Sequence, residues 1–179
     1  IRFAAPPGNI AACTRIPYME TGRVRCLLLA CGNSLRGDDG VGLWLAAWAA
    51  ERFSATAGLR TIARVQWTAD LAQDLAEAES AIFIDASTVA APGITQLRSI
   101  APSADSPVFI AHQLGAPELL ALTHRLYNSL PRTALLLTVG IGSTEMSETF
   151  SAPVQRALTE ACSLLEDAIR GLVTDPQRS

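Results

Sequence analysis

Two adjacent carboxylates, Asp38 and Asp39, stand in a turn framed by glycines within residues 31–42, Cys-Gly-Asn-Ser-Leu-Arg-Gly-Asp-Asp-Gly-Val-Gly. A third carboxylate, Asp85, ends a short apolar run, and His112 ends another. Carboxylate oxygens and an imidazole nitrogen suit a divalent ion of the zinc or nickel kind, and three protein ligands leave positions open for water or substrate. A metal held there would polarise a carbonyl and activate water, which permits hydrolysis without a covalent nucleophile.

Each of these residues also has a purely structural interpretation. Asp38 or Asp39 suits the first turn of a helix, and Asp85 suits the cap of a loop. A single His at a strand end, such as His112, is more often structural than a ligand. The coincidence of these groups at three successive strand ends favours a site over three separate structural roles. General acid and base catalysis by the carboxylates is the alternative to metal chemistry.

The segments that must position these groups alternate between strand and helix patterns. Apolar or alternating runs predict strands at 24–30, 61–67, 81–84, 108–111 and 134–139, with an edge strand at 95–100. Helical patterns begin at Val41, after Thr68 as N-cap, at Pro117 and after Ser151. The alternation predicts a three-layer α/β/α fold whose mainly parallel, twisted sheet carries helices on both faces. Sites in such sheets lie at the carboxyl ends of the strands.

Composition narrows the class of protein. The 179 residues, 49% of them hydrophobic, suit one globular domain. A net charge of -3 with dispersed basic residues argues against nucleic acid as a partner, and no apolar run approaches the ~20 residues that span a bilayer. The four cysteines form no C-x-x-C pair, so we expect a reducing, cytoplasmic location. Cys31 is interpreted as a buried packing residue.

The N-terminal segment carries no clear pattern. Residues 1–18 are expected to be disordered or a non-native extension, with Met19 as the functional start and 19–179 as a single domain. An intact mass of the native protein that includes Ile1 would contradict this expectation.

Other catalytic motifs are missing from the sequence. No Lys follows the last glycine as in a P-loop, and neither G-x-G-x-x-G nor G-x-S-x-G occurs. Backbone N–H groups at a helix start attract phosphate, but Asp38 and Asp39 would repel it. A phosphate-binding enzyme is therefore a weak alternative, which would tolerate Asp39→Asn. His124, in a predicted helix, is interpreted as a surface residue.

Taken together, the motifs resemble a known family, the hydrogenase maturation endopeptidases. Residues 32–42 are similar to the family's motif G-N-x-L-x-x-D-D/E-G-x-G. The resemblance continues with Asp85-Ala86, Pro92-Gly93 and, in part, Ala111-His112, and it covers about residues 24–173. The sequence departs from the family at Ala30, where Gly is usual, at Ala111, where Ser is usual, and in the hydroxyl-rich and acidic stretch 143–148.

The resemblance implies a protease that removes the C-terminal extension of a nickel-iron hydrogenase large-subunit precursor after nickel insertion. Asp39, Asp85 and His112 would be the catalytic residues and the metal ligands. The nickel would come from the precursor, and no organic cofactor is implied. We expect a monomeric or weakly associating enzyme of the metal-dependent or aspartyl type.

The same resemblance gives supporting roles to the residues of the turn. Gly32, Asn33 and Gly40 would shape it, and Asp38 would cap the helix or support the site. The alternative function is a non-catalytic, nickel-sensing chaperone that binds the immature large subunit through the same residues.

Overall fold

The computed structural model describes residues 24–103 and 114–173. Its strands are β1 (Cys26–Cys31), β2 (Leu59–Arg64), β3 (Ser80–Ser87), β4 (Thr95–Ser99) and β5 (Thr133–Gly140). Its helices are the 3-10 helix η1 (Gly37–Gly40) and the α-helices α1 (Val41–Arg52), α2 (Leu71–Glu77), α3 (Ala116–Tyr127) and α4 (Ala152–Val173). No described helix is long and apolar enough to cross a membrane.

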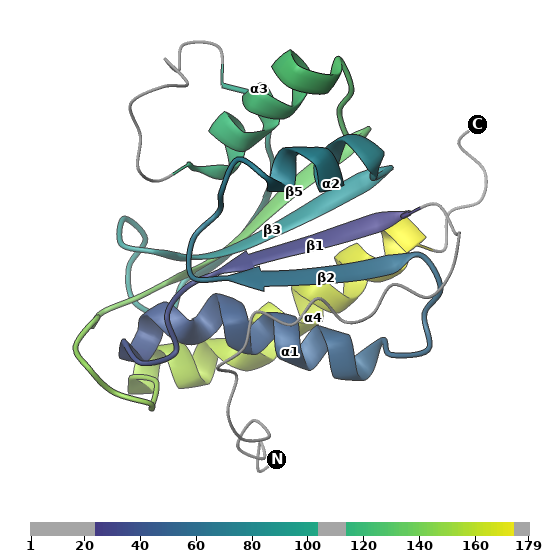
Figure 1. The fold of residues 1–179 in the computed structure, drawn as a ribbon. Coiled ribbons are helices and arrows are strands. Elements are labelled where there is room, and N and C mark those ends of the chain that lie inside the picture. Colours follow the sequence, from purple (N-terminus) through teal and green to yellow (C-terminus); the bar gives the residue numbers. More distant parts are fainter. Residues whose placement is uncertain (1–23, 104–113, 174–179) are drawn as a thin grey trace.

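The strands form one sheet in the order β2-β1-β3-β5-β4. The pairs β1–β2, β1–β3 and β3–β5 are parallel, and β4 pairs antiparallel with β5 at the edge. The chain passes from β1 to β2 on one side and then returns to β3 on the other side of β1 (Figure 1). The carboxyl ends of β1 and β3 therefore meet where the strand order reverses, the usual place for a site in an open α/β sheet.

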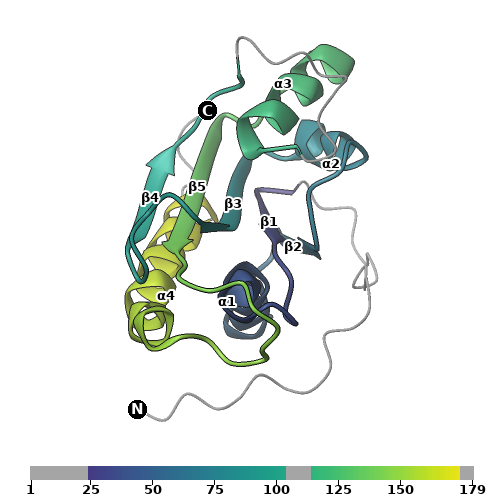
Figure 2. The same cartoon turned by 90° about the vertical axis from the view of Figure 1, so that its left-hand side faces the viewer.

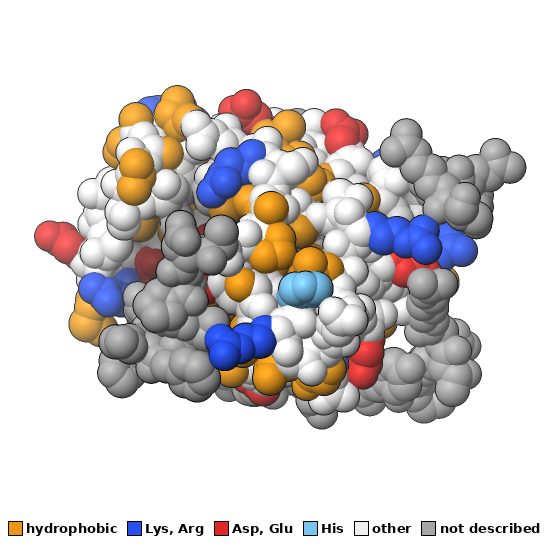
Figure 3. Space-filling view, turned by 90° about the horizontal axis from the view of Figure 1, so that it is seen from above, with side chains coloured by type: hydrophobic (Ala, Val, Ile, Leu, Met, Phe, Trp, Pro, Cys, Tyr) orange, Lys and Arg blue, Asp and Glu red, His pale blue; other side chains and the backbone are white. Residues whose placement is uncertain are grey.

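Helices cover both faces of the sheet. Helices α1 and α4 pack on one face, and α2 and α3 pack together on the other, as the two orthogonal views show (Figures 1 and 2). The predicted three-layer α/β/α fold with a mainly parallel sheet is confirmed. On the face covered by α2 and α3, basic side chains are scattered among apolar and neutral ones (Figure 3).

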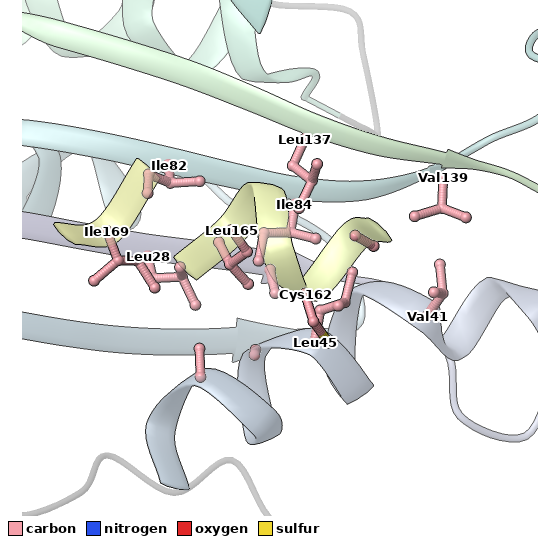
Figure 4. Close-up of a cluster of buried hydrophobic side chains, with 14 of the residues drawn as sticks. Leu28, Val41, Leu45, Ile82, Ile84, Leu137, Val139, Cys162, Leu165 and Ile169 are labelled. Atoms are coloured by element: carbon pink, nitrogen blue, oxygen red, sulfur yellow. The ribbon is translucent and has the colours of Figure 1, made fainter. Parts of the chain in front are cut away.

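The core on the α1 and α4 face joins the central strands to both helices. Leu28 and Ile84 from the sheet meet Leu45 of α1 and Leu165 of α4 (Figure 4). All four side chains are fully buried. Strand β1 is buried along its whole length, which is why it reads as a continuous apolar run rather than as an alternation.

Several predicted boundaries shift in the structure. The strand expected at 61–67 is β2, which ends at Arg64 because its pairing with β1 stops at Cys31. Helix α2 starts after Asp70, so Thr68 is not its N-cap. The strand expected at 108–111 and the N-terminal segment 1–18 lie outside the described residues.

Asp85 was expected to follow its strand, and this placement is wrong. Strand β3 continues to Ser87 because β5 offers backbone partners as far as Gly140. The carboxylate is thus held on a paired strand rather than on a loop, which restricts its orientation more tightly.

Helix α1 approaches the sheet closely at Gly42. A Cβ atom built on this glycine would lie 2.3 Å from the Cys31 carbonyl oxygen and 3.2 Å from that of Ile84. Both contacts are backbone atoms of the central strands, which cannot move aside cheaply. Glycine is therefore what lets the start of α1 lie against the carboxyl ends of β1 and β3.

We expect Gly42→Ala to destabilise the protein by about 3 kcal/mol or more, since the added methyl must push α1 away from two buried strands. The thermal midpoint should fall by roughly 10 °C for a chain of this length. Gly171→Ala is the matched control, because Gly171 is also helical but has open space around its Cα. That variant should gain about 0.5–1 kcal/mol from helix propensity. Equal midpoints for the two variants would contradict the close approach.

Candidate active site at the carboxyl ends of β1 and β3

The glycine turn folds back so that Gly32 lies against the backbone of Asp39. Gly32 has φ +143°, and a Cβ atom there would lie 2.0 Å from the backbone oxygen of Asp39. The next backbone N–H, of Asn33, donates to Asp39 Oδ2 at 2.9 Å. Asn33 Oδ1 in turn accepts from the Leu35 N–H at 3.0 Å. These contacts hold the Asp39 carboxylate against the end of β1.

Asp38 is buried, with 1% of its surface exposed, and is surrounded by donors. Its Oδ1 accepts from the Ser151 N–H at 2.7 Å, and its Oδ2 accepts from the Ser151 hydroxyl at 2.8 Å. Oδ2 also accepts from the N–H groups of Gly142 at 3.1 Å and Ser143 at 3.3 Å. Burial alone would raise the pKa of this carboxyl, but the hydrogen bonds outweigh burial and lower it.

The expected capping role of this acidic pair is wrong. No side chain caps η1 or α1. Asp38 instead binds residues 142–151, the segment that links β5 to α4, while Asp39 binds Asn33. Asp38 and Asp39 lie inside η1 rather than before it, so their side chains bind other segments instead of capping the helix.

Backbone contacts also join the glycine turn to residues 142–151. The Gly37 N–H donates to the Ser147 oxygen at 2.7 Å, and the Ser147 N–H donates to the Leu35 oxygen at 3.1 Å. Arg36 Nε donates to the Thr144 oxygen at 3.3 Å. The sequence analysis did not predict these contacts between the turn and residues 142–151. The feature that could have indicated them is the hydroxyl-rich stretch 143–148, which departs from the family pattern.

Asp85 lies beside Asp39 at the edge of the sheet. Asp85 Oδ1 accepts from the Ala86 N–H at 2.8 Å and from the Cys31 thiol at 3.1 Å. Burial raises the pKa of Asp85, the hydrogen bonds from Cys31 and Ala86 lower it, and the negative charge of Asp39 raises it. The net direction is upward. The structure thus brings two of the three predicted site residues together.

Cys31 is buried, as expected, but its thiol also donates a hydrogen bond to Asp85. Burial raises the pKa of its thiol, and the charges of Asp85 and Asp39 raise it further. The thiol therefore keeps its proton at neutral pH and acts as a hydrogen-bond donor.

The metal-binding prediction depends on a residue that the structure does not describe. His112, the third expected ligand, lies outside the described residues. Within residues 24–103 and 114–173, no three or more His, Cys, Asp and Glu side chains are grouped to hold a metal ion. The three-ligand set therefore stays a prediction.

Several solved structures with a similar fold are hydrogenase maturation peptidases, although no family model and no curated protein matches the sequence. The hydrogenase maturating endopeptidase HybD from E. coli has a TM-score of 0.65 and 23% identity, over 82% of this chain and 93% of that chain. The hydrogenase 2 maturation peptidase from a Thaumarchaeota archaeon has a TM-score of 0.57 and 25% identity, over 83% of this chain and 99% of that chain. The NiFe hydrogenase maturation protease HybD from Thermococcus kodakarensis has a TM-score of 0.59 and 23% identity, over 80% of this chain and 98% of that chain.

The comparisons confirm the resemblance found in the sequence. The chain has the fold of the hydrogenase maturation endopeptidases, and it spans nearly the whole length of each of these relatives.

We expect Asp38→Asn to lower the free energy of unfolding at neutral pH by about 3 kcal/mol, because buried donors lose a charged acceptor. A carboxyl with a lowered pKa stabilises above its unfolded pKa of about 3.9, and this contribution is lost as pH falls through the folded value. The difference between wild type and variant, followed by chemical denaturation, should therefore narrow below about pH 4. The exposed control Asp167→Asn should change stability by less than about 0.5 kcal/mol. A gap that widens in acid would overturn this account.

Asp85→Asn should have the opposite effect and raise the thermal midpoint at neutral pH. A carboxyl with a raised pKa destabilises the fold above that pKa, and the penalty vanishes below the unfolded value of about 3.9. The gain should therefore be present at pH 7 and disappear near pH 3 in the same titration. A variant less stable than wild type at pH 7 would show that Asp85 is a structural group.

Proposed function

We propose that this chain is an endopeptidase that removes the C-terminal extension of a nickel-iron hydrogenase large-subunit precursor after nickel insertion. The observation that carries the proposal is the pairing of Asp39 with Asp85 at the switch point of a fold shared with hydrogenase maturation endopeptidases. Burial and the negative charge of Asp39 both raise the pKa of Asp85, and carboxyl groups with a pKa shifted in this way are typical of functional sites.

The proposed role of the two carboxylates is to bind the nickel that the precursor carries. Asp39 Oδ2 accepts from Asn33, and Asp85 Oδ1 accepts from Cys31 and Ala86. Among the described residues, the other oxygen of each carboxylate receives no hydrogen bond. These two oxygens, with the imidazole of His112, would form the ligand set, and processing would wait for the metal because the site is incomplete without it.

The carboxylates also suit acid and base work on the peptide bond. The surroundings of Asp85 favour its protonated form, which suits donation of a proton to the leaving amine. Asp39 would then accept the proton of the attacking water. Both routes need the same two side chains, so one set of variants tests them together.

The proposal is tested by incubating the purified chain with a nickel-loaded large-subunit precursor and measuring loss of the C-terminal peptide by mass spectrometry. We expect Asp39→Asn and His112→Ala to lower the rate at least about a hundredfold, since each removes a group that meets the metal. Their thermal midpoints should stay within a few degrees of wild type. Nickel-free precursor should not be cleaved.

Matched controls and opposing outcomes are available in the same chain. His124→Ala, on the exposed side of α3, and Asp167→Asn should process at the wild-type rate. Binding of the precursor without cleavage would favour the nickel-sensing chaperone. Full cleavage by Asp39→Asn would contradict the proposed role of Asp39, and unfolding of the site variants would return Asp39 and His112 to structural roles.

A further inference from the structure

Cys31 and Asp85 occupy neighbouring positions on adjacent parallel strands. The register pairs Ala30 of β1 with Ile84 of β3, so Cys31 and Asp85 are the next residues along each strand. Side chains alternate across a sheet, and Cys31 lies with Leu27 on the face covered by α2 and α3. The thiol reaches sideways across the gap between the strands and donates to Asp85 Oδ1 at 3.1 Å.

This contact decides which oxygen of Asp85 is used inside the protein. The Ala86 N–H donates to the same oxygen, Oδ1, at 2.8 Å. Among residues that the structure describes, nothing donates to Oδ2. The Ala86 N–H belongs to β3, the strand that carries Asp85, whereas the Cys31 thiol belongs to β1. Cys31 is therefore the contact that ties the carboxylate to the neighbouring strand.

We propose that Cys31 is a positioning residue for Asp85: its thiol holds Oδ1 and leaves Oδ2 presented to the substrate. The proposal rests on the proposed function, in which Asp85 meets the nickel or the peptide of the precursor. It departs from the interpretation of Cys31 as a packing residue. The two differ in what they require at position 31, a hydrogen-bond donor or a volume.

The first experiment examines the hydrogen bond without any substrate. The infrared spectrum of wild type minus that of Cys31→Ser isolates the S–H stretching band of Cys31 from those of the other cysteines. We expect this band at the lower frequency typical of a hydrogen-bonded thiol, and we expect Asp85→Ala to move it upward. A band that does not respond to Asp85→Ala would overturn the proposal, whatever the protein cleaves.

The second experiment measures cleavage of the nickel-loaded precursor by Cys31→Ala and Cys31→Ser. Loss of a group that orients a ligand typically costs about 10–100-fold, so Cys31→Ala should lower kcat by at least about tenfold with KM nearly unchanged. Cys31→Ser keeps a donor and should stay within about threefold of wild type. A packing role predicts the reverse order, because a buried hydroxyl is worse than a methyl group in an apolar site.

Cys162→Ala is the matched control for the lost volume. Cys162 of α4 is 7% exposed against 8% for Cys31, and it packs in the other core cluster. It should lose a similar amount of stability and keep full activity. Equal kcat for the alanine variants at positions 31 and 162 would overturn the positioning role. Failure of wild type to cleave would overturn the proposed function instead, and the infrared result would still decide whether the thiol holds Asp85.

Discussion

The rest of the site depends on the hydrogen bonds that the buried carboxylate of Asp38 accepts. A charge removed from water is tolerated only where donors replace the water, and here the donors are two backbone N–H groups after β5 and Ser151, directly before α4. The glycine turn and the 142–151 segment are therefore held as one unit. Because Asp38 points into this unit, its neighbour Asp39 is directed to the other side, toward β1 and β3.

Close backbone contacts then bring Asp39 up to Asp85. Gly32 lets the turn close on the Asp39 backbone, and Gly42 lets α1 begin against the ends of both central strands. A larger side chain in place of Gly32 or Gly42 would push these backbones apart and so separate Asp39 from Asp85. The adjacent acids thus have different roles: hydrogen bonds stabilise the ionised carboxylate of Asp38, and the charge of Asp39 adds to burial in raising the pKa of Asp85.

The sequence predicted the parts of this arrangement that depend on local patterns. Apolar runs located β1, β3 and β5, and parallel strands with helical connections placed Asp39 and Asp85 at one edge of the sheet. It did not predict the partners of Asp38, which lie more than 100 residues away and are mostly backbone N–H groups, which every residue carries. The role of Cys31 was missed for a related reason. A cysteine that only packs and a cysteine that also donates to a carboxylate look the same in the sequence.

The acidic pair explains why the surrounding structure is so strongly tied together. Asp39 and Asp85 repel each other when both are ionised, and half-buried carboxylates with few donors favour any motion that separates them. The sheet resists this motion on one side, because β3 stays paired past Asp85. The Asp38 contacts resist it on the other, because they fix the turn to the 142–151 segment that leads into α4. Two carboxylates held together against their own repulsion favour a partner of opposite charge, which is the part that the proposed function gives to the nickel of the precursor.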